Sequence, residues 1–535
     1  MPPESIQGDG SSVTRSPQAD PTKQFKTQLP RNLFLQVCAF AMRIAVGILL
    51  TPYLVHQLGR AAYGLVPIAG VMTQYVALIT ICVSSSVSRF LSIALQKEDL
   101  EDSNRIFNTA FFSYVGLGLI QMPIFGLIIY FARTVFTIPP ELYHDAIILL
   151  VCSALSFVIN LVCSVFGVPI YANNRLDMTR SVEIGSEILR LVGIVTLFVV
   201  LGPALRRVGY VDLTVTVLRS ATYAVIGKRL APMLKINLRA YDWHKVRQLT
   251  SMGWWLLINQ IAFLLFLRID IWVCNRFIGA EQAGDYAAVL QWSNLIRQAG
   301  ALLSGVTGPM VMIYYARAQM ESLVRLSQLS VRVLCIFLAI PISILCVSGS
   351  LLLKLWLGTS FVHLAPLLTV LVCHLVINVG VLPLFSIQTA LNRVKWPGLV
   401  SLVMGVCNLT LAITFAKYLD WGVYGIAIAG ALVLTLKNAV FTPVYAARIL
   451  GRPWYTFVWS QTSGLVLLAA LTTFGYALKH YVGFTSWAQV VVVILMMGLS
   501  GLTAAWLVLP RTDRRLLIDL APGPFRALTA RWLPA

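Results

Sequence analysis

The sequence is poor in charge. Only 12% of its 535 residues are Asp, Glu, Lys or Arg, about half the roughly 25% of a soluble globular domain. Hydrophobic residues make up 58%, and the mean hydropathy is +0.79. This composition excludes an ordinary soluble protein. The length leaves room for about a dozen or more membrane-spanning helices of roughly 20 residues each.

Motifs for metal binding, cofactor binding and catalysis are also missing. The nine cysteines all lie in apolar stretches, the six histidines are scattered, and no CxxC or Cys/His cluster occurs, so neither a disulfide framework nor a zinc site is predicted. No nucleotide-binding loop, HExxH motif or serine elbow is present. The predicted outer loops are short, which leaves little room for catalytic carboxylates. We therefore expect no cofactor, and a transporter rather than an enzyme.

Apolar runs of spanning length recur along the chain, separated by short polar or Pro/Gly-containing breaks. They predict an all-α polytopic membrane protein with about fourteen transmembrane helices. The weakest run is 208–227, which carries Asp212 and Arg219. The predicted spans are 33–57, 64–95, 108–131, 145–170, 179–201, 208–227, 252–278, 284–316, 328–357, 362–390, 397–417, 421–447, 456–478 and 486–509.

Lys and Arg are distributed unevenly between alternate loops. With the N-terminus placed inside, 25 of the 41 basic residues fall in inner segments, 8 in outer segments and 8 within spans. This bias predicts that both termini are cytoplasmic in a multi-pass protein. It also explains the net charge of +20 through orientation and contact with membrane lipids, so no nucleic-acid partner is expected. The first thirty residues lack the apolar region of a signal peptide.

The two halves of the chain carry a weak repeat. LVHQLGRAAYG at 54–64 and CNRFIGAEQAGDY at 274–286 each contain two glycines five residues apart, at an offset of 220. Because six helices is an even number, the copies are predicted to be parallel repeats that form two lobes, followed by two additional C-terminal helices. The predicted organisation is a disordered cytoplasmic tail (1–30), an N-terminal six-helix lobe (31–227), a basic amphipathic cytoplasmic linker (228–250), a C-terminal six-helix lobe (251–447), two more transmembrane helices (448–510) and a basic cytoplasmic tail (511–535).

Ionisable side chains inside the predicted spans are the most informative feature. A charge at bilayer depth costs about 2.5–3.5 kcal/mol on insertion scales, yet pairing cannot neutralise eight cations with four acids. Some charges have a structural explanation: Glu187 and Arg190 can pair within one helix, and Arg219 and Arg332 can snorkel to the membrane surface. The cations are Arg43, Arg89, Arg190, Arg219, Arg268, Arg297, Arg332 and Lys437, and the acids are Glu183, Glu187, Asp212 and Asp270.

Four arginines are candidates to line a polar cavity. Arg43 lies deep in the first span, Arg89 shares a serine-rich face of the second, and Arg297 extends a polar stripe on the eighth. The fourth, Arg268, stands two residues from Asp270 in LLFLRIDIWVC. Two residues turn a helix by about 200°, so this pair cannot meet. We expect one of the two to face the cavity and the other an adjacent helix.

With two six-helix lobes, the LGRAAYGLV turn and the basic bridge, residues 31–510 resemble the polysaccharide-specific, Wzx-like flippases of the multidrug/oligosaccharidyl-lipid/polysaccharide exporter superfamily. The resemblance implies that an undecaprenyl-diphosphate-linked oligosaccharide is moved across the bacterial inner (cytoplasmic) membrane for O-antigen (lipopolysaccharide) or exopolysaccharide biosynthesis. It also implies alternating access between lobes lined by the first, second, seventh and eighth helices, which carry the four candidate arginines. Asp270 and Glu187 are candidates for coupling or for orienting an arginine, and a polymerase and chain-length machinery are candidate partners.

Three alternatives stay open at this point. A multidrug exporter of the same superfamily would carry cationic drugs and use buried acids, which the excess of cations disfavours. A lipid II flippase of the superfamily is a closer alternative. A membrane-embedded glycosyltransferase or polymerase is disfavoured by the short outer loops.

Overall fold

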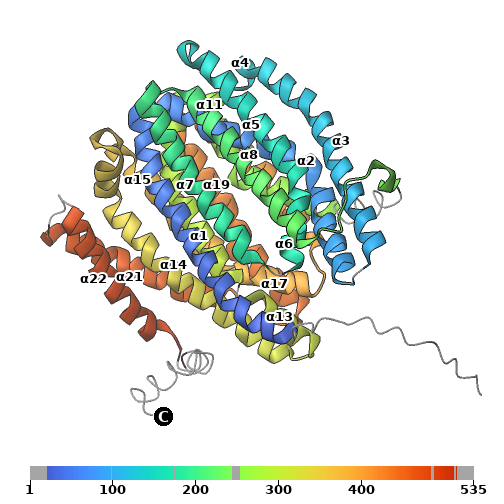
Figure 1. The fold of residues 1–535 in the computed structure, drawn as a ribbon. Helices are drawn as coiled ribbons and strands as arrows, with labels where there is room; N and C mark the ends of the chain where they lie inside the picture. Colours follow the sequence, from blue (N-terminus) through green and yellow to red (C-terminus); the bar gives the residue numbers. More distant parts are fainter. Residues whose placement is uncertain are drawn as a thin grey trace, which may run out of the picture.

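The computed structural model describes residues 21–97, 99–173, 175–243, 254–305, 307–482, 487–510 and 514. Within this part the chain is helical and contains no strand, which confirms the predicted fold class. Each of the fourteen predicted spans coincides with one helix or a set of consecutive helices (Figure 1). Residues 1–20 of the predicted N-terminal tail (1–30), residues 244–250 of the predicted linker and the predicted C-terminal tail (511–535), apart from Arg514, lie outside the described residues.

The N-terminal lobe is a bundle of six spans. Its first helix begins at Pro21, inside the segment predicted to be a disordered tail; proline is favoured at the first position of a helix because its missing N–H would have no partner there. Helices α1, α2, α5, α8 and α7 pack as successive neighbours around the bundle, and α3 lies against α2 and α5. The helices are α1 (Pro21–Leu58), α2 (Arg60–Gln96), α3 (Leu100–Tyr130), the short α4 (Ala132–Val135), α5 (Tyr143–Cys163) continued by α6 (Val168–Ala172), α7 (Leu176–Leu201) and α8 (Leu205–Leu230).

The C-terminal lobe repeats the six spans, with more interruptions. The long, largely buried α14 is its centre, and the two additional helices α21 and α22 pack against it at one edge of the molecule (Figure 1). The helices are α10 (Trp254–Leu267), α11 (Ile269–Phe277), α12 (Ala280–Gly305), α13 (Thr307–Ala316), α14 (Met320–Leu357), α15 (Ala365–Cys373), α16 (Leu375–Gly380), α17 (Leu382–Ala390), α18 (Lys395–Ile413), α19 (Gly422–Leu436), α20 (Thr442–Ile449), α21 (Trp459–Val482) and α22 (Trp487–Val508).

Most of these helices can cross a membrane. Among the described residues eleven stretches are long and apolar enough, and twelve are if the bent pair α10–α11 counts as one span. The remaining two predicted spans are α8, which carries six charged residues between Arg206 and Arg229, and α22, whose apolar part covers only Val491–Leu507. Because α8 packs along α5 and α7, it lies within the bundle like the other spans.

The two lobes make a backbone contact at two of the repeated glycines, Gly64 and Gly284. A Cβ atom on Gly64 would lie 2.8 Å from the carbonyl oxygen of Ala280, and one on Gly284 would lie 2.0 Å from that of Arg60. The offset of 220 maps Gly64 onto Gly284 and Arg60 onto Ala280, so the two contacts are equivalent, as expected for an isologous contact on a two-fold axis. Only residues without a side chain permit this approach, so the glycine pair brings α2 and α12 into backbone contact.

The first half of the linker is fastened to the N-terminal lobe. Asn104 and Asn108 lie one turn apart on α3, and each side-chain amide bonds to the extended backbone of the linker. Asn104 donates to the Met233 carbonyl (3.1 Å) and accepts from the Lys235 N–H (2.9 Å). Asn108 donates to the Lys235 carbonyl (2.9 Å) and accepts from the Asn237 N–H (2.7 Å). The chain up to this point therefore belongs to the N-terminal lobe.

Candidate functional site

A cavity of about 540 Å³ lies between the lobes, bounded by α1, α2 and α7 on one side and by α10 and α12 on the other. One face of α1 lines it at helical spacing, from Arg43 through Gly47 to Leu54. The charged residues that line it are Arg43, Glu187, Arg190, Arg268 and Arg297. With four cations and one acid, this interlobe cavity is suited to an anion.

Arg268 faces the interlobe cavity because the helix breaks there. Arg268 separates α10 from α11, which are bent by 45°. The break lets Arg268 line the cavity, while Asp270 on the next helix is buried against α12. No proline or glycine in LLFLRIDIWVC signals this break. The structure thus assigns the two charges that the sequence left open: the arginine to the cavity and the carboxylate to an adjacent helix.

Two of the cavity arginines carry charge without an ion pair. Among the described side chains, Arg297 and Arg268 form no salt bridge, and the buried Nε of Arg268 lacks a hydrogen-bond partner. Desolvated guanidinium groups cost free energy unless their N–H donors are satisfied. These two side chains are therefore the strongest candidates to bind an anionic ligand.

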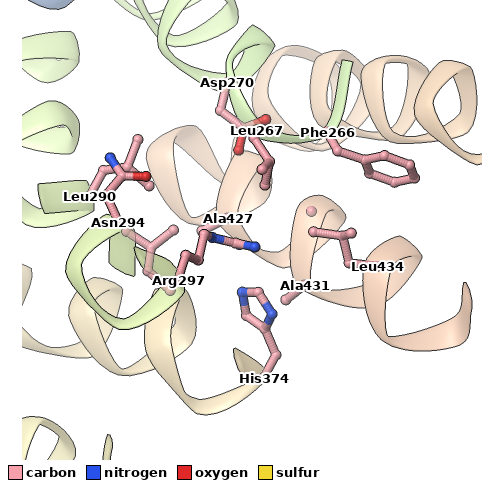
Figure 2. A pocket seen from close by; sticks show the side chains of 12 residues that line it. Phe266, Leu267, Asp270, Leu290, Asn294, Arg297, His374, Ala427, Ala431 and Leu434 are labelled. Atoms are coloured by element: carbon pink, nitrogen blue, oxygen red, sulfur yellow. The ribbon is translucent and has the colours of Figure 1, made fainter. Parts of the chain in front are cut away.

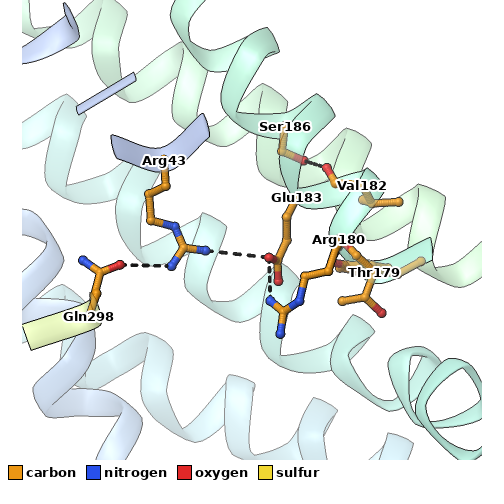
Figure 3. A network of polar contacts seen from close by, with 8 residues as sticks. Arg43, Thr179, Arg180, Val182, Glu183, Ser186 and Gln298 are labelled. Carbon is orange, nitrogen blue, oxygen red and sulfur yellow. Dashed lines mark hydrogen bonds and ion pairs between the residues drawn. The ribbon is translucent and has the colours of Figure 1, made fainter. Parts of the chain in front are cut away.

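Arg43 is partly neutralised across the cavity. Its Nη2 lies 3.7 Å from the Glu183 carboxylate of α7, and its Nη1 donates a long 3.4 Å hydrogen bond to Gln298 of α12 (Figure 3). Glu183 is also held at 2.7 Å by Arg180. Because the Arg43 side chain is 48% exposed, these contacts are weak. They join the lobes through a polar bridge that a ligand could displace.

Arg190 does not pair with Glu187, contrary to the structural explanation that the sequence suggested. Its Nε lies 2.6 Å from Asp212 of α8, so the pair forms between helices. The sequence could not reveal this because the partners are 22 residues apart and meet only through the packing of α7 on α8. Glu187 consequently has no ion pair among the described residues and lines the interlobe cavity.

Asp270 adjoins a second, much smaller cavity of about 20 Å³ inside the C-terminal lobe. Tyr286 donates a hydrogen bond of 3.2 Å to its Oδ2, whereas its Oδ1 and the Oδ1 of Asn408 are buried without partners. Figure 2 shows Arg297 and His374 pointing toward one another, with Asp270 across this cavity. Since about 10–15 Å³ is enough for one water, the space suits a water.

The fourth candidate, Arg89, lies on α2. Its side chain lies outside the described residues, as do the side chains of the neighbouring serines 84 to 86. The structure therefore brings Arg43, Arg268 and Arg297 together and does not place Arg89.

One end of the interlobe cavity is closed. Arg60, Gly64, Thr137, Asn275 and Gly284 form the contact region there, which we call the closed end. The side-chain amide of Asn275 accepts a hydrogen bond of 2.8 Å from the Thr137 backbone N–H and donates one of 3.1 Å to the Thr137 carbonyl. Arg60 lies 3.5 Å from two carboxylates of α12, those of Glu281 and Asp285. These contacts join the two lobes at this end of the cavity.

Comparison with known proteins gives a family match and a relative of similar length. The profile of a family described as "Polysaccharide biosynthesis protein" matches residues 31–312. The chain is 29% identical over 488 residues to the uncharacterized membrane protein EpsK of Bacillus subtilis (strain 168), which spans 91% of this chain and 96% of that protein.

Solved structures share the fold. The lipid II flippase MurJ in an inward closed conformation superposes with a TM-score of 0.64 at 14% identity, over 91% of this chain and all of that chain (100%). An inward-facing multidrug resistance MATE family transporter of the MOP superfamily superposes with a TM-score of 0.62 at 14% identity, over 80% of this chain and 95% of that chain.

Proposed function

The chain belongs to the polysaccharide biosynthesis protein family, and from this premise we propose that it flips an undecaprenyl-diphosphate-linked oligosaccharide across the bacterial inner membrane by alternating access. The observation that carries the proposal is the cationic interlobe cavity, where Arg268 and Arg297 lack ion pairs among the described residues. The product would serve lipopolysaccharide or exopolysaccharide synthesis.

The chemistry of a diphosphate matches this cavity. A guanidinium fork binds phosphate oxygens through two parallel hydrogen bonds and stays charged when desolvated. The lipid tail can remain in the bilayer while the headgroup crosses in water, so the hydrocarbon core is never exposed to charge. Arg43, Arg268 and Arg297 would bind the headgroup, and Arg89 of α2 is proposed as a fourth contributor. Because each contact is of moderate strength, the headgroup can be released on the outer side of the membrane.

Two carboxylates are candidates to couple transport to an ion or to orient an arginine. Asp270 has one unpartnered oxygen beside a cavity large enough for one water. Asp270 and Arg297 line the same small cavity. Binding of an ion by the Asp270 carboxylate would therefore change the electrostatic potential at Arg297. Glu187 lines the interlobe cavity itself, where the headgroup would bind. The proposal involves neither a cofactor nor a chemical reaction.

The charge of the cavity separates this proposal from its nearest alternative. A multidrug exporter that carries organic cations needs acids in its binding site, whereas the interlobe cavity holds four cations and one acid. A lipid II flippase would use the same headgroup chemistry and differ only in the glycan. A polymerase and chain-length proteins are proposed as partners that receive the exported glycan.

A deletion strain tests the function. Loss of this protein is expected to remove surface polysaccharide and to let lipid-linked oligosaccharide accumulate in the membrane, because synthesis continues while export stops. Thin-layer chromatography of extracted lipid-linked sugars measures the accumulation. Sensitivity to cationic drugs should not change. Increased drug sensitivity with normal surface polysaccharide would favour the multidrug alternative instead.

The proposed orientation places both termini and the linker in the cytoplasm, on the basis of the Lys and Arg bias. On a cysteine-free background, we expect an impermeant maleimide to label Lys354→Cys in intact spheroplasts and to label Lys235→Cys only after permeabilisation. Both lysines are exposed, so access depends on the side of the membrane. Labelling of position 235 from outside would overturn the orientation.

A further inference from the structure

A third cavity, of about 520 Å³, lies inside the N-terminal lobe between α2, α5, α7 and α8. We call it the annex. It adjoins the interlobe cavity, because Val66, Pro67, Glu187 and Arg190 line both. Its volume falls within the roughly 300–1,000 Å³ of small-molecule sites. The proposed binding of the diphosphate in the interlobe cavity gives no role to the annex.

The annex differs from the interlobe cavity in its charge. Its two cations, Arg190 and Arg219, are matched by two acids, Glu187 and Asp212. The Arg190–Asp212 ion pair is closed at 2.6 Å. An anion would therefore prefer the interlobe cavity, and the annex suits a ligand that is neutral but polar.

Hydroxyl and amide groups make up much of the remaining lining. Ser156 Oγ and Arg219 Nε are buried without a hydrogen-bond partner among the described residues. Such groups cost free energy unless water or a ligand satisfies them. Arg219 also donates to Asn160 at 3.2 Å, and Phe157 adds an aromatic ring. The polar residues are Thr73, Ser153, Ser156, Asn160, Ser186 and Thr216.

We propose that the annex binds the glycan of the lipid-linked substrate while the interlobe cavity binds its diphosphate. Sugars present many hydroxyl donors and acceptors, which charged pairs, serines and an asparagine can satisfy in several orientations. The Phe157 ring, which lines the annex, offers an apolar surface for a sugar. The proposal rests on the proposed function, since it takes the diphosphate site as its starting point. An ion site is a poorer match, because 520 Å³ far exceeds the space of one ion.

Binding of two probes tests the proposal. The probes are undecaprenyl diphosphate and undecaprenyl diphosphate bearing one N-acetylhexosamine, and native mass spectrometry of the detergent-purified protein measures each dissociation constant. The wild type is expected to bind the glycosylated probe at least about tenfold more tightly, which is roughly 1.4 kcal/mol. The annex variant Ser153→Leu/Ser156→Leu, which fills the cavity and removes two hydroxyls, should lose this preference and keep its affinity for the bare diphosphate.

Ser113→Leu is the matched control, because Ser113 Oγ is also buried and unpartnered but lines neither cavity. This variant should bind both probes like the wild type, and Arg297→Ala should weaken both equally. Equal affinity of the wild type for the two probes would overturn the annex proposal and leave the diphosphate site intact. An annex variant that weakens both probes would also overturn it. Failure of the wild type to bind either probe would overturn the proposed function together with the annex.

Discussion

Replacing Gly284 by leucine is expected to abolish transport while the protein remains in the membrane at normal abundance. A Cβ atom at this position would lie 2.0 Å from the Arg60 carbonyl oxygen, a distance that no side-chain rotation can relieve. The two helices must therefore separate, and the closed end cannot form. Because only the contact between the lobes is lost, each six-helix bundle should still fold. Surface polysaccharide and protein abundance, measured in the same cells, check the prediction.

The trapped state can be identified by labelling. A cysteine at Leu54, which lines the interlobe cavity close to the closed end, should become reactive toward an impermeant maleimide from the closed side in the Gly284→Leu background. Gly305→Leu is the matched control, since Gly305 lies on the same helix and a Cβ atom there would have no neighbouring atom within 4 Å. Normal transport by Gly284→Leu would show that closure of this end is not part of the cycle.

Reversing the charge of Arg297 or Arg268 should reduce export by more than any change at Arg43. These two arginines form no ion pair among the described residues, whereas Arg43 already has Glu183 nearby. Loss of a charge-assisted hydrogen bond of about 1.5–3 kcal/mol corresponds to roughly tenfold to a hundredfold weaker headgroup binding. Arg297→Glu and Arg268→Glu should fall below the corresponding alanine variants, because glutamate repels the diphosphate.

Lysine substitution distinguishes binding from scaffolding. Arg297→Lys should recover part of the activity, because it keeps the charge and loses the guanidinium fork. Arg206→Lys serves as the control, since Arg206 pairs with Asp145 and lines neither the interlobe cavity nor the annex. If Arg268→Glu and Arg297→Glu export polysaccharide at wild-type levels, these arginines are scaffold charges.

Hydropathy and the repeat predicted the architecture because both depend on local sequence. A spanning helix must satisfy its backbone internally and present apolar side chains to lipid, so its signal is a contiguous run. Gly64 and Gly284 could be matched from sequence because a backbone contact on a two-fold axis demands the same residue on both sides. The surplus of arginine in the spans was likewise visible without a structure.

The pairing of the buried charges could not be predicted in the same way. Asp212 neutralises Arg190 only because α8 packs on α7, and the nearer Glu187 was the natural candidate within one helix. The orientation of Arg268 and Asp270 depends on a break that no glycine or proline announces. His374 lies at the turn between the short helices α15 and α16, within an apolar run, and lines the same small cavity as Arg297. These features depend on tertiary packing, which periodicity does not report.

The most direct test of the central claim is translocation by the purified protein in proteoliposomes. An undecaprenyl-diphosphate-linked oligosaccharide is placed in both leaflets, and an impermeant glycosidase added outside measures how much lipid-linked glycan becomes accessible over time. The wild type should make the inner-leaflet pool accessible, whereas Arg297→Glu should leave it protected like protein-free vesicles. Equal accessibility with the wild type and with Arg297→Glu would contradict the claim that the cationic interlobe cavity carries the headgroup across the membrane.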